Sequence, residues 1–216
     1  LCYAPVLRAM PKTAAEAPFV KNGYVTFGSF NNFAKVSDDM LALWRGVLER
    51  MKGAHLVIKS KICSIPAGQK IVRERLQRFG IPDAQVELRP YSPDYLEQYR
   101  DIDIALDTAP YTGGVTTCEA LYMGVPVVTR YGRRRGTRFG LSLLKNVGLD
   151  ELAAADGRAY IEKAAALAHD AALLDELHRT LRSRLAASSV MQATSYMAEI
   201  ERFYELAVEK KMEEEG

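Results

Sequence analysis

The chain has 216 residues, of which 48% are hydrophobic and 26% charged, and its formal net charge at neutral pH is +2. These values fit a globular protein that buries a sizeable core, and they argue against a nucleic-acid binder that relies on bulk positive charge. No apolar run approaches the roughly 20 residues that a membrane-spanning helix needs, and no signal-peptide pattern is recognisable. Three cysteines without zinc-ligand spacing predict reduced thiols, so we expect a cytoplasmic protein without membrane partners.

The elements predicted in chain order begin with an extended linker. Residues 1–22 contain three prolines and little periodicity, which favours a linker lying on a surface. A first strand is expected at 24–27, and a polar loop, 28–32, follows it. Up to residue 101 the pattern then predicts a helix capped by Ser37, a strand at 55–59, a helix at 69–79, a strand at 86–88 and a short helix starting at 92.

The stretch 102–129 is the part around which the remaining chain is organised. It predicts a buried strand at 102–106, a turn at Gly113-Gly114, a helix at 115–123 and a second buried strand from Val127. A basic loop at 131–138 follows, and the last part of the chain is helical. The expected helices there contain residues 139–144, 159–169, 173–185 and 196–211, and an acidic tail ends the chain.

Strands that alternate with helices across short loops predict an α/β fold with a doubly wound parallel sheet, Rossmann-like, and helices on both faces. In such sheets, ligands bind at the carboxyl ends of the strands, near the point where the strand order reverses. The loops at 28–32 and 113–114 both follow predicted strands. We therefore expect these two loops to lie together at one edge of the sheet.

The chemistry of the 113–119 segment suits an anion. A glycine-rich loop before a helix presents free backbone N–H groups and the positive end of the helix dipole. Thr116 and Thr117 add hydroxyl donors in the first turn, which makes a phosphate or diphosphate a natural occupant. Glu119 lies about one turn further on, where a carboxylate could accept hydrogen bonds from ribose hydroxyls. An ordinary Gly-Gly turn with threonine capping explains the same residues, and the residues alone leave both interpretations open.

Other polar residues are expected to be structural. Asp107 directly follows a predicted strand, where an aspartate commonly accepts hydrogen bonds from its own loop. The three histidines, His55, His169 and His178, fall on predicted strand or outer helices, and we expect structural roles for them.

Two motifs carry a family resemblance. LDTAPYTGGVTTCEALYMGVPVVT at 106–129, together with FGSFNNFAK at 27–35, resembles the glycosyltransferase family that contains O-GlcNAc transferase and SPINDLY. The similarity runs from about Gly23 to the C-terminus. It implies the C-terminal, nucleotide-sugar-binding half of a two-domain GT-B enzyme, in a chain that is a piece of a longer protein. Within it we expect a lead-in at 1–22, a nucleotide-sugar-binding domain at 23–190 and a C-terminal helix with acidic tail at 191–216.

The resemblance also implies roles for individual residues. Lys35 would be the catalytic residue that contacts the pyrophosphate and neutralises the leaving group. Glu119 would bind the ribose, and backbone groups at the end of the third strand would hold the base. Arg138, with Thr137, matches a shared family feature better than the neighbouring arginines do. The full donor-binding set implied by the resemblance is Asn32, Lys35, Arg89, Pro90, Tyr95, Gly113, Gly114, Val115, Thr116, Thr117, Glu119 and Arg138.

Two positions depart from the family pattern. Tyr95 stands where many members have a histidine, and Gly114 stands where the animal enzyme has one. A tyrosine can donate a hydrogen bond but does not titrate near neutral pH, so an acid–base role carried over from that histidine is in doubt. No other residue of the chain stands out as a general base.

The function implied is donor binding in an inverting, metal-independent glycosyltransferase, and the favoured reaction transfers GlcNAc from UDP-GlcNAc to protein Ser/Thr. No Asp-x-Asp pair stands in a loop of the metal-binding type, since Asp101-x-Asp103 straddles a strand start. Because the family places its peptide-binding repeats upstream, the protein acceptor would bind mainly through a missing N-terminal region, and this chain alone would bind donor weakly without turnover. GDP-fucose or a UDP-hexose as donor, and a non-catalytic nucleotide-binding or scaffold module, remain alternatives. A dehydrogenase or a kinase is disfavoured because GxGxxG and GxxxxGK[ST] are both missing.

Overall fold

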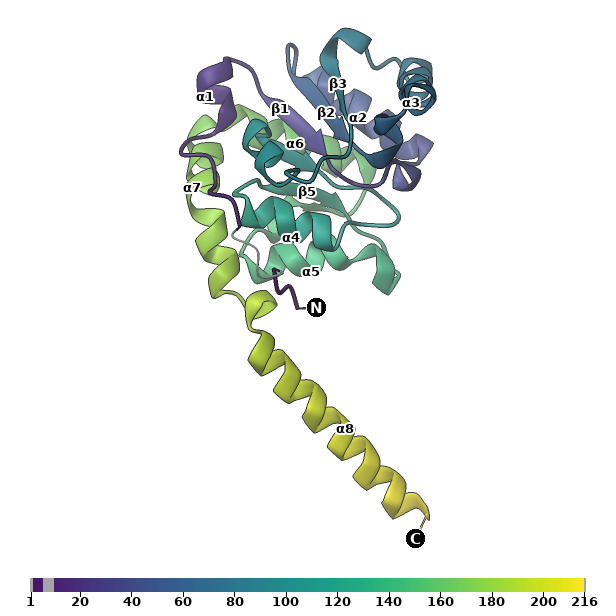
Figure 1. Ribbon diagram of the computed structural model, residues 1–216, viewed down its shortest axis with the longest axis vertical. Coiled ribbons are helices and arrows are strands. Elements are labelled where there is room, and N and C mark those ends of the chain that lie inside the picture. The colour runs from purple at the N-terminus through teal and green to yellow at the C-terminus, as the bar shows by residue number, and fades with distance from the viewer. Residues whose placement is uncertain (1, 6–9, 216) are drawn as a thin grey trace.

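One parallel sheet organises the molecule (Figure 1). The computed structural model describes residues 2–5 and 10–215, and within them six strands pair in the order β3-β2-β1-β4-β5-β6. Every pairing is parallel, so the carboxyl ends of the strands share one edge. The strands are β1 (Thr26–Ser29), β2 (His55–Lys59), β3 (Val86–Arg89), β4 (Ile104–Leu106), β5 (Val127–Arg130) and β6 (Ala153–Ala154). The order reverses between β1 and β4, which confirms the predicted doubly wound sheet and marks its switch point.

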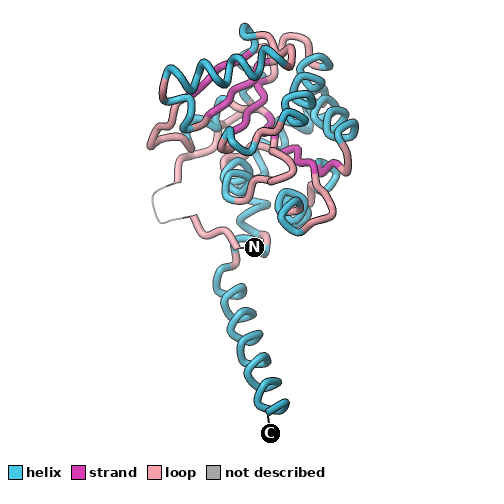
Figure 2. Tube along the Cα trace, turned by 90° about the vertical axis from the view of Figure 1, so that its right-hand side faces the viewer, coloured by secondary structure: helices cyan, strands magenta, loops and turns pink. Residues whose placement is uncertain are grey.

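Helices cover both faces of this sheet, as Figure 2 shows around the magenta strands. Right-handed crossovers place α2 and α3 on one face and α4 and α5 on the other, because the chain runs outward in opposite directions from β1 and from β4. Helix α6 then returns to pack against α2, and α7 packs against α4. The helices of this body are α1 (Pro18–Asn22), α2 (Asp38–Arg50), α3 (Pro66–Arg78), α4 (Val115–Tyr122), α5 (Phe139–Asn146), α6 (Gly157–His169) and α7 (Ala171–Ala187).

Local signals set several of these boundaries. The Ser37 hydroxyl accepts a hydrogen bond from the Met40 N–H at 3.3 Å, which caps α2 as predicted. Asp156 caps α6 in the same way, through the Ala159 N–H at 2.8 Å. On its inner side α2 buries Trp44 completely against the core. The helices are thus held by the amphipathic pattern that predicted them.

Several boundaries differ from the prediction. Helix α1 interrupts the segment expected to be extended, with Pro18 at its first position, where the missing N–H costs no hydrogen bond. Strand β1 continues through Gly28 and Ser29, because both residues pair with β2. The short helix expected from residue 92 is instead a turn followed by a 3₁₀ helix, Glu97–Asp101. Strand β6 was not predicted, since two alanines carry no strand signal of their own.

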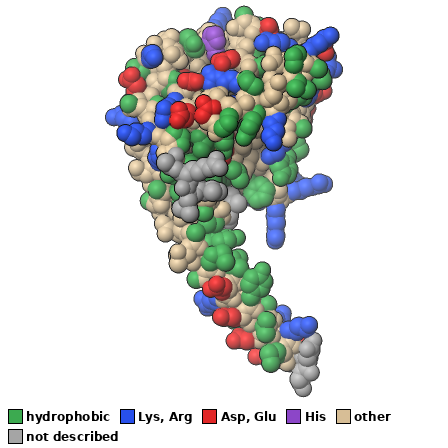
Figure 3. Space-filling model, in the orientation of Figure 1, with side chains coloured by type: hydrophobic (Ala, Val, Ile, Leu, Met, Phe, Trp, Pro, Cys, Tyr) green, Lys and Arg blue, Asp and Glu red, His purple; other side chains and the backbone are tan. Residues whose placement is uncertain are grey.

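The last helix, α8 (Ala193–Glu215), projects away from the body (Figures 1 and 2). The predicted helix at 196–211 is confirmed and is longer at both ends. Its Phe203 and Tyr204 side chains are 67% and 70% exposed, and Figure 3 shows hydrophobic and acidic groups along its length. In the part of the chain that the structure describes, no helix combines the length and apolar character needed to cross a membrane.

Candidate functional site

A cleft of about 430 Å³ opens at the carboxyl edge of the sheet, beside the switch point between β1 and β4. Its walls come from four places: the loop after β1, the ends of β2 and β3, and the first turns of α4. The two loops that we expected to meet at one edge therefore do so. The lining residues are Phe30, Asn32, Lys59, Ser60, Lys61, Tyr91, Tyr95, Val115, Thr116 and Glu119.

The loop that leads into α4 is fixed by Asp107. One oxygen of this buried carboxyl accepts hydrogen bonds from the Thr108 and Gly113 N–H groups at 2.8 and 2.7 Å. The other oxygen accepts from the Thr129 hydroxyl on β5 at 2.7 Å. Burial raises the pKa of Asp107, while these three hydrogen bonds act in the opposite direction. Asp107 thus has the structural role predicted for it.

Gly113 is required where this loop meets α4. A Cβ added there would lie 2.5 Å from the Thr117 hydroxyl and 2.7 Å from the Thr116 hydroxyl. The loop therefore packs directly on the first turn of α4, and Thr117 is buried beneath it. Thr116 instead reaches the cleft, where its hydroxyl donates to the Asn31 side-chain oxygen at 3.0 Å. This bond joins the loop after β1 to the N-terminus of α4.

Glu119 and Tyr95 form the polar centre of the cleft. The Tyr95 hydroxyl donates a short hydrogen bond to the Glu119 carboxylate, and Glu119 is only 7% exposed. Glu119 is therefore not a solvated surface residue of α4. Burial raises the pKa of Glu119, and the hydrogen bond from Tyr95 opposes that shift. Burial and the neighbouring carboxylate raise the pKa of Tyr95 as well, so its hydroxyl is a donor at neutral pH.

Lys35 ends a 3₁₀ turn, Phe33–Lys35, that follows the cleft loop. Its ammonium lies 4.3 Å from the centre of the Tyr111 ring, in the loop before α4. The Asn32 side-chain oxygen accepts from the Ala34 N–H at 3.1 Å, so this oxygen caps the turn that carries Lys35. Lys35 also lowers the pKa of Asp107, as a minor contribution after desolvation and hydrogen bonding. The charge of Lys35 is therefore on the α4 side of the site.

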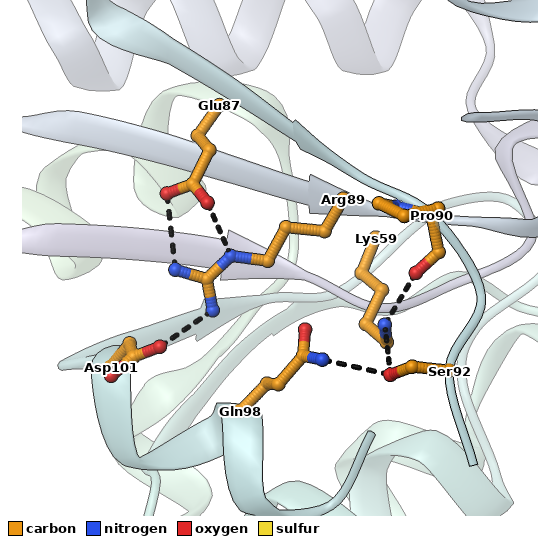
Figure 4. A network of polar contacts seen from close by, with 7 residues as sticks. All are labelled: Lys59, Glu87, Arg89, Pro90, Ser92, Gln98 and Asp101. Atoms are coloured by element: carbon orange, nitrogen blue, oxygen red, sulfur yellow. Dashed lines mark hydrogen bonds and ion pairs between the residues drawn. The ribbon is translucent and has the colours of Figure 1, made fainter. Parts of the chain in front are cut away.

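The structure brings only part of the predicted set into the cleft lining. Arg89 points elsewhere: its guanidinium pairs with Glu87 at 2.7 and 3.0 Å and with Asp101 at 2.7 Å (Figure 4). The Pro90 carbonyl accepts from the Lys59 ammonium at 2.5 Å. Arg138 is exposed and precedes α5. The predicted residues that line the cleft are Asn32, Tyr95, Val115, Thr116 and Glu119, whereas Lys35, Arg89, Pro90, Gly113, Gly114, Thr117 and Arg138 lie outside its lining.

Sequence reasoning missed Asn31, Lys59, Lys61 and Tyr91. Lys59 could have been found from its position in the chain, because it ends β2 and therefore lies at the same edge of the sheet as the loops after β1 and β4. The three histidines lie outside the cleft lining, as expected. His178 is buried, with its Nε2 2.8 Å from the Asp103 carbonyl oxygen. Among residues 2–5 and 10–215, no cluster of three or more His, Cys, Asp or Glu side chains is arranged to hold a metal ion.

The arrangement has the chemistry of a site for an elongated, anionic and partly aromatic ligand. The α4 N-terminus and nearby Lys35 provide positive potential at one end. A buried carboxylate on α4 lines the same cleft, and lysines with an exposed tyrosine ring line it near the ends of β2 and β3.

Comparison with known proteins places this architecture. The model of glycosyl transferase family 41 matches residues 8–200. The probable UDP-N-acetylglucosamine–peptide N-acetylglucosaminyltransferase SPINDLY of Solanum lycopersicum is 38% identical over 94% of the chain and 22% of its own length. The UDP-N-acetylglucosamine–peptide N-acetylglucosaminyltransferase of Caenorhabditis elegans is 22% identical over 82% of the chain and 15% of its own length.

Solved structures agree. A mutant of the Thermobaculum terrenum O-GlcNAc transferase superposes with a TM-score of 0.83 and 33% identity, over 94% of this chain and 38% of that one. Sucrose-phosphate synthase from Thermosynechococcus elongatus, at 14% identity and a TM-score of 0.63, covers 91% of this chain and 50% of its own and shares the fold alone. The chain spans about a fifth of the length of the curated SPINDLY relatives that it matches. Because the family model covers most of the chain, the chain belongs to glycosyl transferase family 41.

Proposed function

We propose that this chain is the donor-binding half of an inverting, metal-independent glycosyltransferase that transfers GlcNAc from UDP-GlcNAc to serine or threonine hydroxyls of proteins. The observation that carries the proposal is the cleft itself, which runs from the N-terminus of α4 to a buried carboxylate, Glu119, at the switch point of the sheet. A nucleoside diphosphate offers matching groups in the same order: phosphates, ribose hydroxyls and base.

The phosphates would lie at the α4 end. Val115 and Thr116 of the first turn line the cleft there, and Lys35 adds a full positive charge nearby. In the reaction, the acceptor hydroxyl oxygen bonds to the anomeric carbon while the bond from that carbon to the diphosphate oxygen breaks. Charge then grows on the departing UDP, and Lys35 with the helix dipole would stabilise it. The acceptor hydroxyl also releases its proton, and no residue of this chain is proposed to take it.

The ribose would lie over Glu119. Its carboxylate accepts hydrogen bonds, and the Tyr95 hydroxyl holds one of its oxygens in place. A buried carboxylate with one side-chain donor among the described residues has lone pairs left for ribose hydroxyls. In this role Tyr95 positions Glu119 and does not act as an acid or base.

The similarity to SPINDLY and to O-GlcNAc transferases, which are named as UDP-N-acetylglucosamine–peptide transferases, supports a sugar-nucleotide donor and a protein acceptor. These relatives are several times longer than this chain. We therefore propose that the acceptor binds mainly to regions outside it, and that the complete enzyme acts in the cytoplasm.

Calorimetric titration of the chain with UDP and with GDP tests the proposal. UDP should bind saturably and unchanged by EDTA, and Lys35→Ala should weaken it roughly tenfold or more, the worth of one charge-assisted contact. Glu119→Ala should weaken it similarly, whereas Glu119→Gln retains an acceptor and should lose less. Lys70→Ala, which removes an exposed lysine of α3, is the matched control.

Two results would count against this assignment. Tighter binding of GDP than UDP would replace UDP-GlcNAc by GDP-fucose as the donor. Saturable binding that neither Lys35→Ala nor Glu119→Ala changes would remove the nucleotide from this cleft.

A further inference from the structure

A buried lysine lines the cleft at the carboxyl end of β2. Lys59 ends β2 and is only 5% exposed, yet it forms part of the cleft lining. Its ammonium donates to the Pro90 carbonyl oxygen at 2.5 Å and to the Ser92 hydroxyl oxygen at 3.0 Å (Figure 4). Lysines are rarely buried to this extent, so this position needs an explanation.

The neighbours of Lys59 hold its ammonium in one place. Ser92 also accepts a hydrogen bond from the Gln98 amide at 2.8 Å. The Ser92 hydroxyl in turn lowers the pKa of the Asp94 carboxyl by donating to it, which fixes the direction of its own proton. Burial lowers the pKa of Lys59. An ammonium has three N–H donors, and two have partners among the described residues, which leaves one for the cleft.

The base of a bound nucleotide would reach this lysine. The inference rests on the proposed function, which puts the phosphates at the N-terminus of α4 and the ribose at Glu119. The cleft continues from Glu119 to the ends of β2 and β3, where Lys59 and Tyr91 lie. The Tyr91 ring is 57% exposed and offers a face on which a planar base can stack. Its backbone is held by a hydrogen bond from the Tyr91 N–H to the Ser64 hydroxyl at 3.0 Å.

We propose that Lys59 selects the base of the donor nucleotide by donating its remaining N–H to a keto oxygen on the edge of the base. Uracil and guanine carry such an oxygen, at O4 and O6. Cytosine and adenine carry an amino group at the corresponding position, which would face the ammonium donor to donor. Lys59 thereby admits keto bases and rejects amino bases.

The pair of UDP and CDP isolates this contact, because the two bases share size and shape and differ at this edge. Calorimetry on the wild-type chain should show UDP binding roughly tenfold or more tightly than CDP, and GDP more tightly than ADP, since a buried donor left unpaired is costly. Lys59→Gln presents both a donor and an acceptor, so both ratios should fall to near one. Lys70→Gln, at an exposed lysine of α3 outside the cleft lining, should leave both ratios unchanged.

A purely structural lysine predicts a different result. If Lys59 only anchors the segment 90–92, Lys59→Gln would weaken all four nucleotides by the same factor and preserve both ratios, which would overturn the inference. Equal binding of UDP and CDP to the wild type would overturn it too. Absence of all nucleotide binding would instead refute the proposed function, and the inference would fall with it.

A second variant covers the case in which Lys59→Gln does not fold, as judged by its thermal unfolding curve. Ser92→Ala keeps the lysine but removes one of its two anchors. The ratio of UDP to CDP affinity should then fall by about threefold or more, while an unchanged ratio would contradict the inference.

Discussion

Replacing Asp107 with alanine should destabilise the fold strongly, because three buried donors would lose the carboxyl group that accepts all their hydrogen bonds. These donors are the Thr108 N–H, the Gly113 N–H and the Thr129 hydroxyl. A buried donor without a partner costs about 1–3 kcal/mol. The three together bound the loss at roughly 3–9 kcal/mol, and since water from the neighbouring cleft can reach the vacated space, we expect about 3–4 kcal/mol.

Asp107→Asn provides the control. The asparagine oxygen can keep both N–H contacts, and its amide can donate to the Thr129 hydroxyl oxygen, so the loss should stay within about 1 kcal/mol. Urea denaturation followed by fluorescence of the single tryptophan, Trp44, measures both variants against the wild type. A loss below about 1 kcal/mol for Asp107→Ala would refute the reasoning, as would equal losses for the two variants.

Three further outcomes follow from the buried residues. Burial raises the pKa of Asp103 to about 6, so the folded state binds its proton more tightly than the unfolded chain does. The free energy of unfolding should therefore fall by about 2–2.5 kcal/mol as pH rises from about 4 to 7, and Asp103→Asn should remove this slope in urea titrations. Gly124→Ala should lower the free energy of unfolding by about 2 kcal/mol or more in the same assay, because its φ is +83° and an added Cβ would lie 2.6 Å from a carbonyl oxygen of α7. Gly23→Ala should lower it by only about 1 kcal/mol, because Gly23 has φ +74° but open space around it. Burial raises the pKa of Cys118 to about 12, so Ellman's reagent should modify it at least about 100-fold more slowly than the half-buried Cys2. Comparable modification rates of the two cysteines would contradict the burial of Cys118.

The sheet and the meeting of its two loops could be predicted because they follow from alternation along the chain. Short apolar runs that alternate with capped amphipathic segments leave few topologies, and the rule that ligands bind at the carboxyl edge then places the loops. Strand β6 could not be predicted, because its two alanines form a strand only by pairing with β5. This pairing depends on the tertiary structure and leaves no pattern in the local sequence.

Side-chain placement within the cleft was harder to predict for the same reason. Neighbouring asparagines, Asn31 and Asn32, look alike in the sequence, yet one bonds to Thr116 and the other caps its own turn. Lys59 looks like any solvated lysine at a strand end until the segment 90–92 folds over it. For Arg89 the family resemblance implied a backbone contact with the base, and it did not indicate that the guanidinium pairs with Glu87 and Asp101.

The hydrogen bonds of Asp107 connect the loop before α4 to distant parts of the chain. Tyr160 is completely buried on α6, and its hydroxyl donates to the Asp107 carbonyl oxygen at 3.0 Å, across a separation of 53 positions in the chain. The Thr129 hydroxyl on β5 donates a hydrogen bond to the Asp107 carboxyl group. The alignment of the α4 N-terminus therefore depends on β5 and α6, neither of which contributes to the cleft lining. A change at Tyr160 would register in a binding assay as a defect of the cleft, and inspection of the cleft walls alone would miss its origin.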